Sequence, residues 1–377
     1  MHIIKVGLLS GHRTENAPAR WNRALARPGA KNSPTLSLVR GSEHANISLY
    51  TIVTPSLSNP AHPHNDTTPV TYASMEETTH KQPVSLTFIS TGTVKIRPSM
   101  RGQPATSFAG RSATLRRLWS FTDRKWSPDL PIGVFVISHP DGPILFDTGE
   151  SPMCNDPGYL PWWVPERMVA SYTITPDDGI VTQLAAHGID PKSLQAIVIS
   201  HLHGDHAGGL KDLAAAAPDV PVYVSRGQWD AFGNSPFLAT FKGCAPQHWP
   251  KDFRPKLLEF TDHIVGPWKQ SAKITPDGKV LAVPTPGHSP GHISLVVYGG
   301  DDERTKTTYF LPGDATYAVE LLDKEEPDGI NDDPVTALQS LKLIKEFARQ
   351  TDVVVLPSHD PDVRLLLRDK RVYKPSS

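Results

Sequence analysis

The segment with the clearest chemical character is His201-Leu-His203-Gly-Asp205-His206, which holds three imidazoles and one carboxylate. Imidazole and carboxylate groups are ligands that zinc and other divalent transition ions prefer. In extended backbone, residues two apart project to the same side, so His201 and His203 are predicted to share one ion. Asp205 and His206 come after the next turn and are predicted to face a second ion. The alternative is a histidine-rich turn that binds no metal. In that case the HxHxDH spacing would be a chance occurrence.

Four ligands cannot complete two coordination spheres, so this interpretation requires further ligands elsewhere in the chain. Three residues fit because each follows a predicted strand: His288 after residues 280–283, Asp314 after 308–311 and His359 after 353–356. A carboxylate at the position of Asp314 can bridge two ions, whereas His292, which opens the next strand, is interpreted as a supporting residue. Two ions about 3.5–4 Å apart generate a hydroxide near neutral pH and polarise a carbonyl. The ligand set therefore predicts a hydrolase with two zinc ions, or with Mn²⁺, Fe²⁺ or Co²⁺ instead.

Strands must position these ligands, and the apolar pattern of the sequence predicts them. The expected strands are residues 84–89 and 94–96, which read as a hairpin, and residues 133–137, 144–146, 196–199, 222–225, 280–283, 293–298, 308–311 and 353–356. Helical patterns cover residues 180–187, 208–216 and 334–349, the last with apolar residues along one face. Strands with interspersed helices predict a layered α/β protein whose sheets are covered by helices.

The pattern also predicts how the chain divides. Residues 1–83 show little periodicity and are expected to form a largely disordered N-terminal extension. Residues 84–370 are expected to form the hydrolase domain, and 371–377 a C-terminal tail. Residues 1–42 are basic, with Glu15 as their only acid, which is a composition shared by organelle transit peptides. A disordered extension on a cytoplasmic protein is the expectation, and organelle targeting by residues 1–42 is the alternative.

Composition limits the partners of this chain of 377 residues. The 38 Lys and Arg residues nearly balance 39 Asp and Glu residues, so no strong positive field attracts nucleic acid or an anionic membrane surface. No apolar stretch reaches the roughly 18–20 residues that span a bilayer. Two cysteines are too few for a disulfide scaffold, which fits a reducing compartment such as the cytoplasm. A small molecule is therefore the expected partner.

The motifs around these ligands resemble those of the metallo-β-lactamase superfamily over about residues 84–370. They are His201-Leu-His-Gly-Asp-His206, Phe146-Asp147-Thr-Gly149, Pro286-Gly-His288, Gly313-Asp314 and Ser358-His359. The resemblance implies an αββα sandwich, in which two packed β-sheets lie between outer helices and the metals bind at one edge. It also implies a ligand set: His201, His203 and His288 on metal one, Asp205, His206 and His359 on metal two, and Asp314 between them. Asp147 would steady the ligand loop.

Within that superfamily, the chain looks like the N-acyl homoserine lactonase-like branch. That branch similarly places a tyrosine three residues after the bridging acid, as Tyr317 follows Asp314 here, and residues 90–98 and 130–140 also look like it. The resemblance implies that a bridging hydroxide opens a lactone or related cyclic ester or amide. Tyr317 would donate a hydrogen bond to the carbonyl oxygen, and Asp205 would relay a proton to the leaving group. The alternative for Tyr317 is a tyrosine that only packs at a strand end.

Two aromatic segments depart from the lactonase pattern. Residues 157–165 and 228–249 carry several tryptophans and are hypothesised to shape a flat aromatic pocket. This favours, as an alternative, a detoxifying hydrolase of a γ-lactam or of a cyclic carbamate such as a benzoxazolinone. Thioester hydrolysis fits less well because no helical domain is evident after His359. A diiron oxidoreductase of this fold typically has glutamate in place of His203, and a metal-binding protein without activity is a further alternative.

Overall fold

The computed structural model describes residues 83–105, 109–164, 168–300 and 306–376. The expected N-terminal extension, including the transit-peptide-like residues 1–42, lies outside this range except for Pro83. Within the described residues, no helix is long and apolar enough to cross a membrane. Residues 371–376 contact the domain, because Tyr373 is buried and its hydroxyl donates to Asp323.

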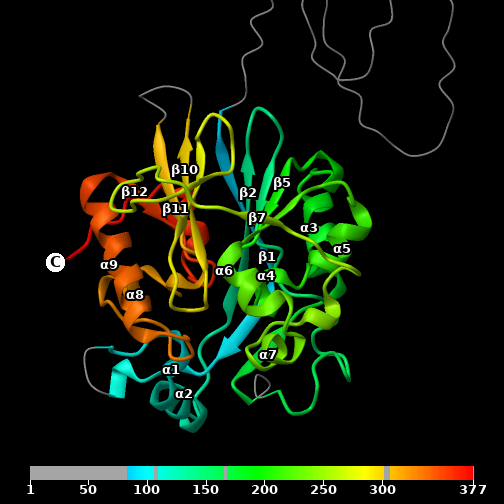
Figure 1. Ribbon diagram of the computed structural model, residues 1–377, viewed down its shortest axis with the longest axis vertical. Coiled ribbons are helices and arrows are strands. Elements are labelled where there is room, and N and C mark those ends of the chain that lie inside the picture. Colours follow the sequence, from blue (N-terminus) through cyan, green and yellow to red (C-terminus); the bar gives the residue numbers. More distant parts are fainter. Residues whose placement is uncertain (1–82, 106–108, 165–167, 301–305, 377) are drawn as a thin grey trace, which may run out of the picture. The chain divides into compact units, whose positions relative to one another are not determined.

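Two β-sheets form the centre of the domain (Figure 1). The larger sheet has seven strands in the order β4 (Ala170–Thr173), β1 (Ser85–Ile96), β2 (Leu130–Ser138), β3 (Ile144–Phe146), β5 (Ala196–Val198), β6 (Val222–Ser225) and β7 (Lys256–Leu258). The smaller sheet has the order β12 (Val353–Val355), β11 (Thr307–Leu311), β10 (Ile293–Gly299), β9 (Val280–Pro284) and β8 (Ala272–Lys273). Most of these strands carry unbroken runs of buried residues, as expected for strands covered on both faces.

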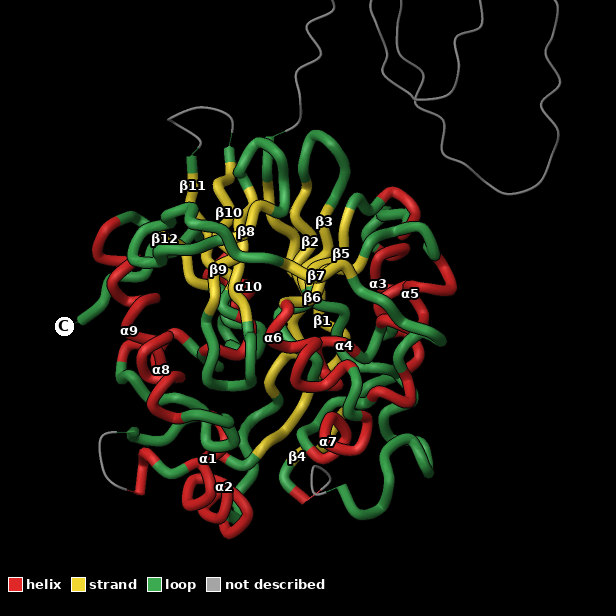
Figure 2. The backbone as a smooth tube through the Cα atoms, in the orientation of Figure 1, coloured by secondary structure: helices red, strands yellow, loops and turns green. Residues whose placement is uncertain are grey.

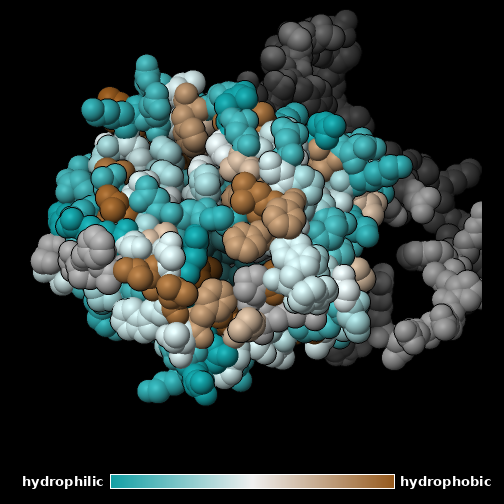
Figure 3. Space-filling view, turned by 60° about the horizontal axis from the view of Figure 1, so that its bottom comes forward, coloured by the Kyte–Doolittle hydropathy of each residue, from teal (hydrophilic) through white to brown (hydrophobic). Residues whose placement is uncertain are grey.

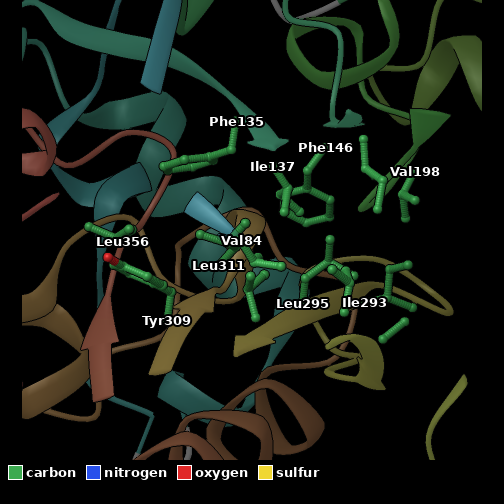
Figure 4. Packing of buried hydrophobic residues seen from close by; sticks show 14 of the residues in the cluster. Val84, Phe135, Ile137, Phe146, Val198, Ile293, Leu295, Tyr309, Leu311 and Leu356 are labelled. Atoms are coloured by element: carbon green, nitrogen blue, oxygen red, sulfur yellow. The ribbon is translucent and has the colours of Figure 1, made fainter. Parts of the chain in front are cut away.

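The main hydrophobic core lies between the two sheets (Figure 4). Phe135 and Phe146 come from the larger sheet, and Leu295 and Leu311 come from the smaller one. Each is fully buried. Burial of one such side chain stabilises the fold by about 1.5–3 kcal/mol, so this interface is the main force that holds the sheets together.

Helices cover the outer faces of both sheets (Figure 2). On the larger sheet, α3 (Ile180–Ala186) and α5 (Leu210–Ala216) bury Leu184 and Leu213 against the strands. On the smaller sheet, α8 (Val319–Asp323) lies beside α9 (Pro334–Gln350), which buries the apolar face predicted from the sequence. The layers are therefore helix, sheet, sheet and helix, and the predicted αββα sandwich is confirmed.

One predicted element is wrong. Residues 85–96 form the single long strand β1 where a hairpin over residues 84–96 was predicted. Residues 85–90 pair with 133–138 of β2, and the register shifts between Ser90 and Thr93 before the pairing resumes. Gly92 adopts a φ of +103°, and a Cβ at this position would lie 2.9 Å from the carbonyl oxygen of Thr173 in β4. The glycine thus permits an irregularity within one strand and a close approach to β4, not a chain reversal.

Several short helices were not predicted. α1 (Pro98–Arg101), α2 (Ala113–Thr122) and α7 (Pro236–Phe241) lie near one end of the domain (Figure 1). α4 (Gly204–Ala207), α6 (Arg226–Gln228) and α10 (Val363–Arg368) lie nearer the sheets (Figure 2). In α2, Ser112 caps the N-terminus through a bond from the Leu115 amide. This helix buries Arg116 and Ser120, whereas Leu118 and Trp119 are exposed. Leu115, Leu118 and Trp119 recur at the spacing of a helix, so the sequence does carry a helical signal here, but the apolar face faces outward instead of toward the core.

Candidate metal centre

The seven predicted ligands come from loops that follow four strands. The His201–His206 segment follows β5, His288 follows β9, Asp314 follows β11, and His359 follows β12. β11 and β12 are parallel, and β10 is antiparallel to both β9 and β11. The carboxyl ends of β9, β11 and β12 therefore share one edge of the smaller sheet, where they meet the loop from the larger sheet.

The first group of side chains consists of His201, His203 and His288. Nδ1 of His203 lies 2.9 Å from Nε2 of His201 and 3.0 Å from Nε2 of His288. The three nitrogens lie within 4.8 Å of one another. Because zinc binds imidazole nitrogens at about 2.0–2.1 Å, three nitrogens this close fit one ion.

The second group consists of Asp205, His206 and His359. The two oxygens of Asp205 face different rings: Oδ1 lies 3.8 Å from Nε2 of His206, and Oδ2 lies 3.5 Å from Nε2 of His359. Their candidate ligand atoms also lie within 4.8 Å of one another. Both imidazoles are almost completely buried, whereas Asp205 is partly exposed.

Asp314 lies between the two groups. Its Oδ1 is 3.1 Å from Nε2 of His206 and 3.3 Å from Nε2 of His359. Its Oδ2 is 3.6 Å from Nε2 of His288, in the first group. The two oxygens of this buried carboxylate therefore face different groups, which is the arrangement that a bridging ligand needs.

Unsatisfied buried atoms test whether a cation fits here. Nε2 of His206, Nε2 of His359 and Oδ1 of Asp314 are buried and have no hydrogen-bond partner in the described part of the chain. They approach one another without hydrogen-bond geometry, as groups do when they point at a common centre. A buried polar atom left without a partner costs about 1–3 kcal/mol. Because a divalent ion would satisfy all three atoms, the residues present fit such an ion.

The electrostatics also favour a cation. Burial and the neighbouring imidazoles hold the pKa of His201 well below its usual value, and burial together with His288 lowers the pKa of His203 to about 4. Both rings are therefore neutral and carry a lone pair for a metal. Burial lowers the pKa of His206 and His359 as well, but the Asp314 carboxylate and its neighbours outweigh it and raise both pKa values. Positive charge is thus stabilised at these positions.

The far side of each ring is held in place. Nδ1 of His206 lies 2.8 Å from Oδ2 of Asp147, a carboxylate that also accepts a 2.7 Å hydrogen bond from the Ser200 amide. Nδ1 of His359 donates to the Pro131 carbonyl at 2.8 Å. These contacts direct each Nε2 inward, as expected for imidazoles around a metal. The expected position of Asp147, behind the ligand loop, agrees with this geometry.

Two supporting contacts concern His288 and Asp314. Nδ1 of His288 lies 3.1 Å from Oδ2 of Asp328, a residue that the sequence did not single out because it belongs to a loop that follows no strand. His292 was interpreted as a supporting residue. Its Nε2 accepts a 3.1 Å bond from the Asp314 amide, and its Nδ1 lies 3.0 Å from the Thr285 hydroxyl. His292 therefore positions the backbone of Asp314.

Comparison with known families agrees with this geometry. The family model described as the Metallo-beta-lactamase superfamily matches residues 128–359, which is more than half of the chain and includes all seven predicted ligands. The chain belongs to this superfamily. The predicted class, a metal-dependent hydrolase, is confirmed, and membership implies that divalent metal is bound.

Individual relatives in the superfamily are N-acyl homoserine lactonases. One from Bacillus thuringiensis is 31% identical over 235 residues, which cover 62% of this chain and 82% of the relative. The lactonase AttM of Rhizobium radiobacter is 27% identical over 236 residues, with 62% and 83% covered. A solved N-acyl homoserine lactone hydrolase, with N-hexanoyl-L-homoserine bound at its catalytic metal centre, superposes with a TM-score of 0.57 at 27% identity. That superposition covers 78% of this chain and 98% of the solved one. The predicted lactonase-like branch is thus confirmed.

In this metallo-beta-lactamase domain, Tyr317 lies against the metal ligands. Its ring stacks on His359 at 5.1 Å and lies 6.2 Å from the ring of His288. Burial, followed by the charge of Asp314, raises the pKa of Tyr317 well above its usual value. The hydroxyl therefore keeps its proton and can act as a hydrogen-bond donor. It lines a cavity together with the ligands His203, Asp205, Asp314 and His359, which we call the inner chamber.

A second cavity, the outer chamber, adjoins the first because both are lined by Met100, His203, Lys242, Gly243 and Ile330. Its wall is largely apolar and includes Phe121 of α2, Val164, Val169 and Phe241 of α7. Figure 3 shows hydrophobic side chains gathered around a hollow on the face toward the bottom of Figure 1, where α2 and α7 lie. A substrate can therefore place an apolar part in the outer chamber and its reacting group in the inner one.

The two segments hypothesised to shape an aromatic pocket reach the outer chamber through Val164 and Phe241. None of the tryptophans in residues 157–165 and 228–249 is among the lining residues. Trp229 and Trp249 pack against each other at 6.1 Å beside the core over the larger sheet. Trp162 is 92% exposed, and Trp163 stacks on Phe237. Single tryptophans in a sequence do not reveal whether they face a core, a pocket or solvent.

Proposed function

We propose that this protein is a lactonase that uses two metal ions to hydrolyse a cyclic ester. The observation that carries the proposal is the two-sided environment of Asp314, whose oxygens face His206 and His359 on one side and His288 on the other. A single ion would leave the side chains on one side of Asp314 without a cation to bind. The names of the relatives, N-acyl homoserine lactonases, support a lactone as the substrate.

The proposed ligand sets follow from the two groups of side chains. Metal one would bind His201, His203 and His288; metal two would bind Asp205, His206 and His359; and Asp314 would bridge the two. Zinc fits this mixture of imidazole and carboxylate ligands best, and Mn²⁺, Fe²⁺ and Co²⁺ are the alternatives. When bound, such a pair of ions supplies an activated water near neutral pH and polarises a carbonyl oxygen.

The roles of the chain's own groups can be derived for lactone hydrolysis. Tyr317 donates a hydrogen bond to the carbonyl oxygen as negative charge develops on it. Asp205, the partly exposed carboxylate of the site, accepts the proton of the attacking water and passes it to the leaving alkoxide oxygen. The C–O bond of the ring breaks, and the product carries a hydroxyl and a carboxylic acid, which releases its proton to solvent to become a carboxylate. The apolar wall of the outer chamber excludes water around the rest of the substrate.

A combined metal and substrate assay tests this function. Metal analysis of purified protein should give about two zinc ions per chain, and the protein should hydrolyse N-acyl homoserine lactones. His203→Ala should remove most of this activity, while the exposed substitution His187→Ala should retain it. Fewer than one metal per chain, or unchanged turnover in His203→Ala, would overturn the proposal. A γ-lactam and a benzoxazolinone belong in the same substrate panel, since faster turnover of either would replace the lactone.

A further inference from the structure

Two cations and one carboxylate from distant parts of the chain meet in the outer chamber. Arg117 belongs to α2, Lys242 follows α7, and Asp332 precedes α9. The Lys242 ammonium and the Arg117 guanidinium both donate to Oδ1 of Asp332. The side chains of Lys242, Arg117 and Asp332 are 24%, 30% and 20% exposed. We call these three residues the charged trio.

The charged trio carries a surplus of positive charge. Burial raises the pKa of Asp332, but the hydrogen bond and charge of Lys242 and the charge of Arg117 outweigh it and hold that pKa below its usual value. Asp332 is therefore ionised, and one negative charge faces two positive charges. The neighbouring wall residues, such as Phe121 and Phe241, are apolar and cannot compensate the remaining charge. A half-buried charge beside apolar groups is costly unless it is paired.

Both cations also have donors that the described residues leave unused. An ammonium has three N–H groups, and Asp332 is the acceptor recorded for Lys242 among the described residues. The Arg117 guanidinium uses Nε and Nη2 to bind the Ile330 carbonyl, and Nη2 also donates to the Asn331 carbonyl and to Asp332. No acceptor within the described chain is recorded for Nη1. The trio can therefore bind an additional anion.

The backbone joins the trio to the proposed ligands of metal one. Lys242 precedes Gly243, whose carbonyl accepts a 3.0 Å hydrogen bond from Gly204, next to His203. On the other side, the Asp332 amide lies 3.1 Å from the carbonyl oxygen of His288, to which it donates. Lys242 lines both chambers. An anion bound to Lys242 would thus belong to the same ligand whose ester reaches the inner chamber.

We propose that Lys242 and Arg117 form an anion-binding subsite and that the substrate is an apolar cyclic ester with a carboxylate substituent. The inference rests on the proposed lactonase function, because it assumes that the inner chamber holds the ester. The apolar body would lie against the outer chamber, and its carboxylate would receive hydrogen bonds from the unused N–H groups of the two cations. Such charge-assisted bonds are stronger than neutral ones.

A matched pair of substrates tests this subsite in the zinc-loaded protein. Two N-acyl homoserine lactones of equal chain length are compared, one ending in a carboxylate and the other in a methyl group. The readout is a ratio: kcat/KM for the carboxylated lactone divided by kcat/KM for the methyl-terminated lactone. Lys242→Met removes the ammonium, Lys242→Arg keeps the charge, and Asp332→Asn increases the positive surplus. Lys211→Met, on the exposed side of α5, is the control.

We expect the wild-type protein and the control to prefer the carboxylated lactone. Lys242→Met should lower the ratio about tenfold, as for the loss of one close charge pair, whereas Lys242→Arg should largely restore it. Asp332→Asn should raise the ratio. Added NaCl should lower the wild-type ratio because salt screens the attraction.

The failures of the inference and of the proposed function are distinguishable. An unchanged ratio in Lys242→Met, or a lower ratio in Asp332→Asn, would show that the trio only clamps the loops together and would overturn the inference. If the wild-type protein hydrolyses neither lactone, the lactonase proposal is wrong. In that case, calorimetry measures how tightly the same two compounds bind. The anion-binding subsite is supported only if the carboxylated compound binds more tightly to the wild-type protein than to Lys242→Met.

Discussion

Oδ2 of Asp328 lies 3.1 Å from Nδ1 of His288, and both side chains are buried. We expect the charge of Asp328 to orient this ring, whose Nε2 lies 3.6 Å from Oδ2 of Asp314. Asp328→Ala should therefore lower zinc affinity about 10- to 100-fold, the usual effect of removing such a partner. Competition with a chromophoric chelator measures the affinity, and Asp369→Ala, an exposed substitution, is the control. Equal affinities in the two variants would contradict this role of Asp328.

Arg116 should be essential for the stability of the α2 region. Its fully buried guanidinium donates to the carbonyl oxygens of Pro104, Gly110, Gln103, Pro327 and Asp328. Arg116→Met would leave these acceptors buried without donors, so the free energy of unfolding should fall by at least about 3 kcal/mol. Denaturant unfolding measures the change, and Arg124→Met, which alters an exposed arginine, should have little effect. A loss below about 1 kcal/mol in Arg116→Met would mean that water replaces the guanidinium.

Gly287 holds the loop that carries His288 close to α9. Its φ is +128°, and a Cβ would lie 2.2 Å from the amide nitrogen of Ala337. Gly188 also has a positive φ, +72°, but a Cβ there meets no atom within 4 Å. Gly188→Ala should cost about 1 kcal/mol through backbone strain alone, whereas Gly287→Ala should cost more and also weaken metal binding. Thermal unfolding and metal analysis compare the two; similar losses of stability would rule out the clash.

Tyr317→Phe separates a role in the reaction from a role in packing. The phenyl ring retains the stacking on His359, so fold and zinc content should be preserved. If the hydroxyl stabilises the developing oxyanion, kcat should fall about 100-fold or more. Steady-state kinetics and metal analysis on the same preparation measure both quantities. A kcat equal to that of the wild type would show that Tyr317 only packs at the strand end.

Removal of the metal should destabilise the protein. Without an ion, Asp205 and Asp314 face the imidazoles with unsatisfied buried atoms between them. An ion present at about 1,000 times its Kd stabilises the folded state by about 4 kcal/mol. For a domain of this size, that corresponds to a fall in Tm of about 5–10 °C after treatment with a chelator. Calorimetry before chelation, after chelation and after added zinc checks the effect, which an unchanged Tm would contradict.

The local pattern of the sequence predicted most of the strands and the helix α9. Apolar runs such as residues 196–199 and 353–356 could be recognised because strands buried on both faces need nearly every side chain to be apolar. The hairpin at residues 84–96 was wrong because a Thr-Gly-Thr segment suits both a turn and a bulge. Which of the two forms depends on pairing with β2 and β4, and those contacts are distant in the sequence.

The sequence by itself determined which residue types form the site. Few polar residues directly follow buried strands, and those that do include histidines and aspartates, which suit a metal. Only the tertiary structure decided how these residues meet: that the oxygens of Asp314 face both groups, and that Asp328 supports His288. The charged trio of Lys242, Arg117 and Asp332 likewise had no signal in the sequence. Arg117 lies in α2, Lys242 follows α7 and Asp332 precedes α9, and only the packing of these helices around the chamber brings the three charges together.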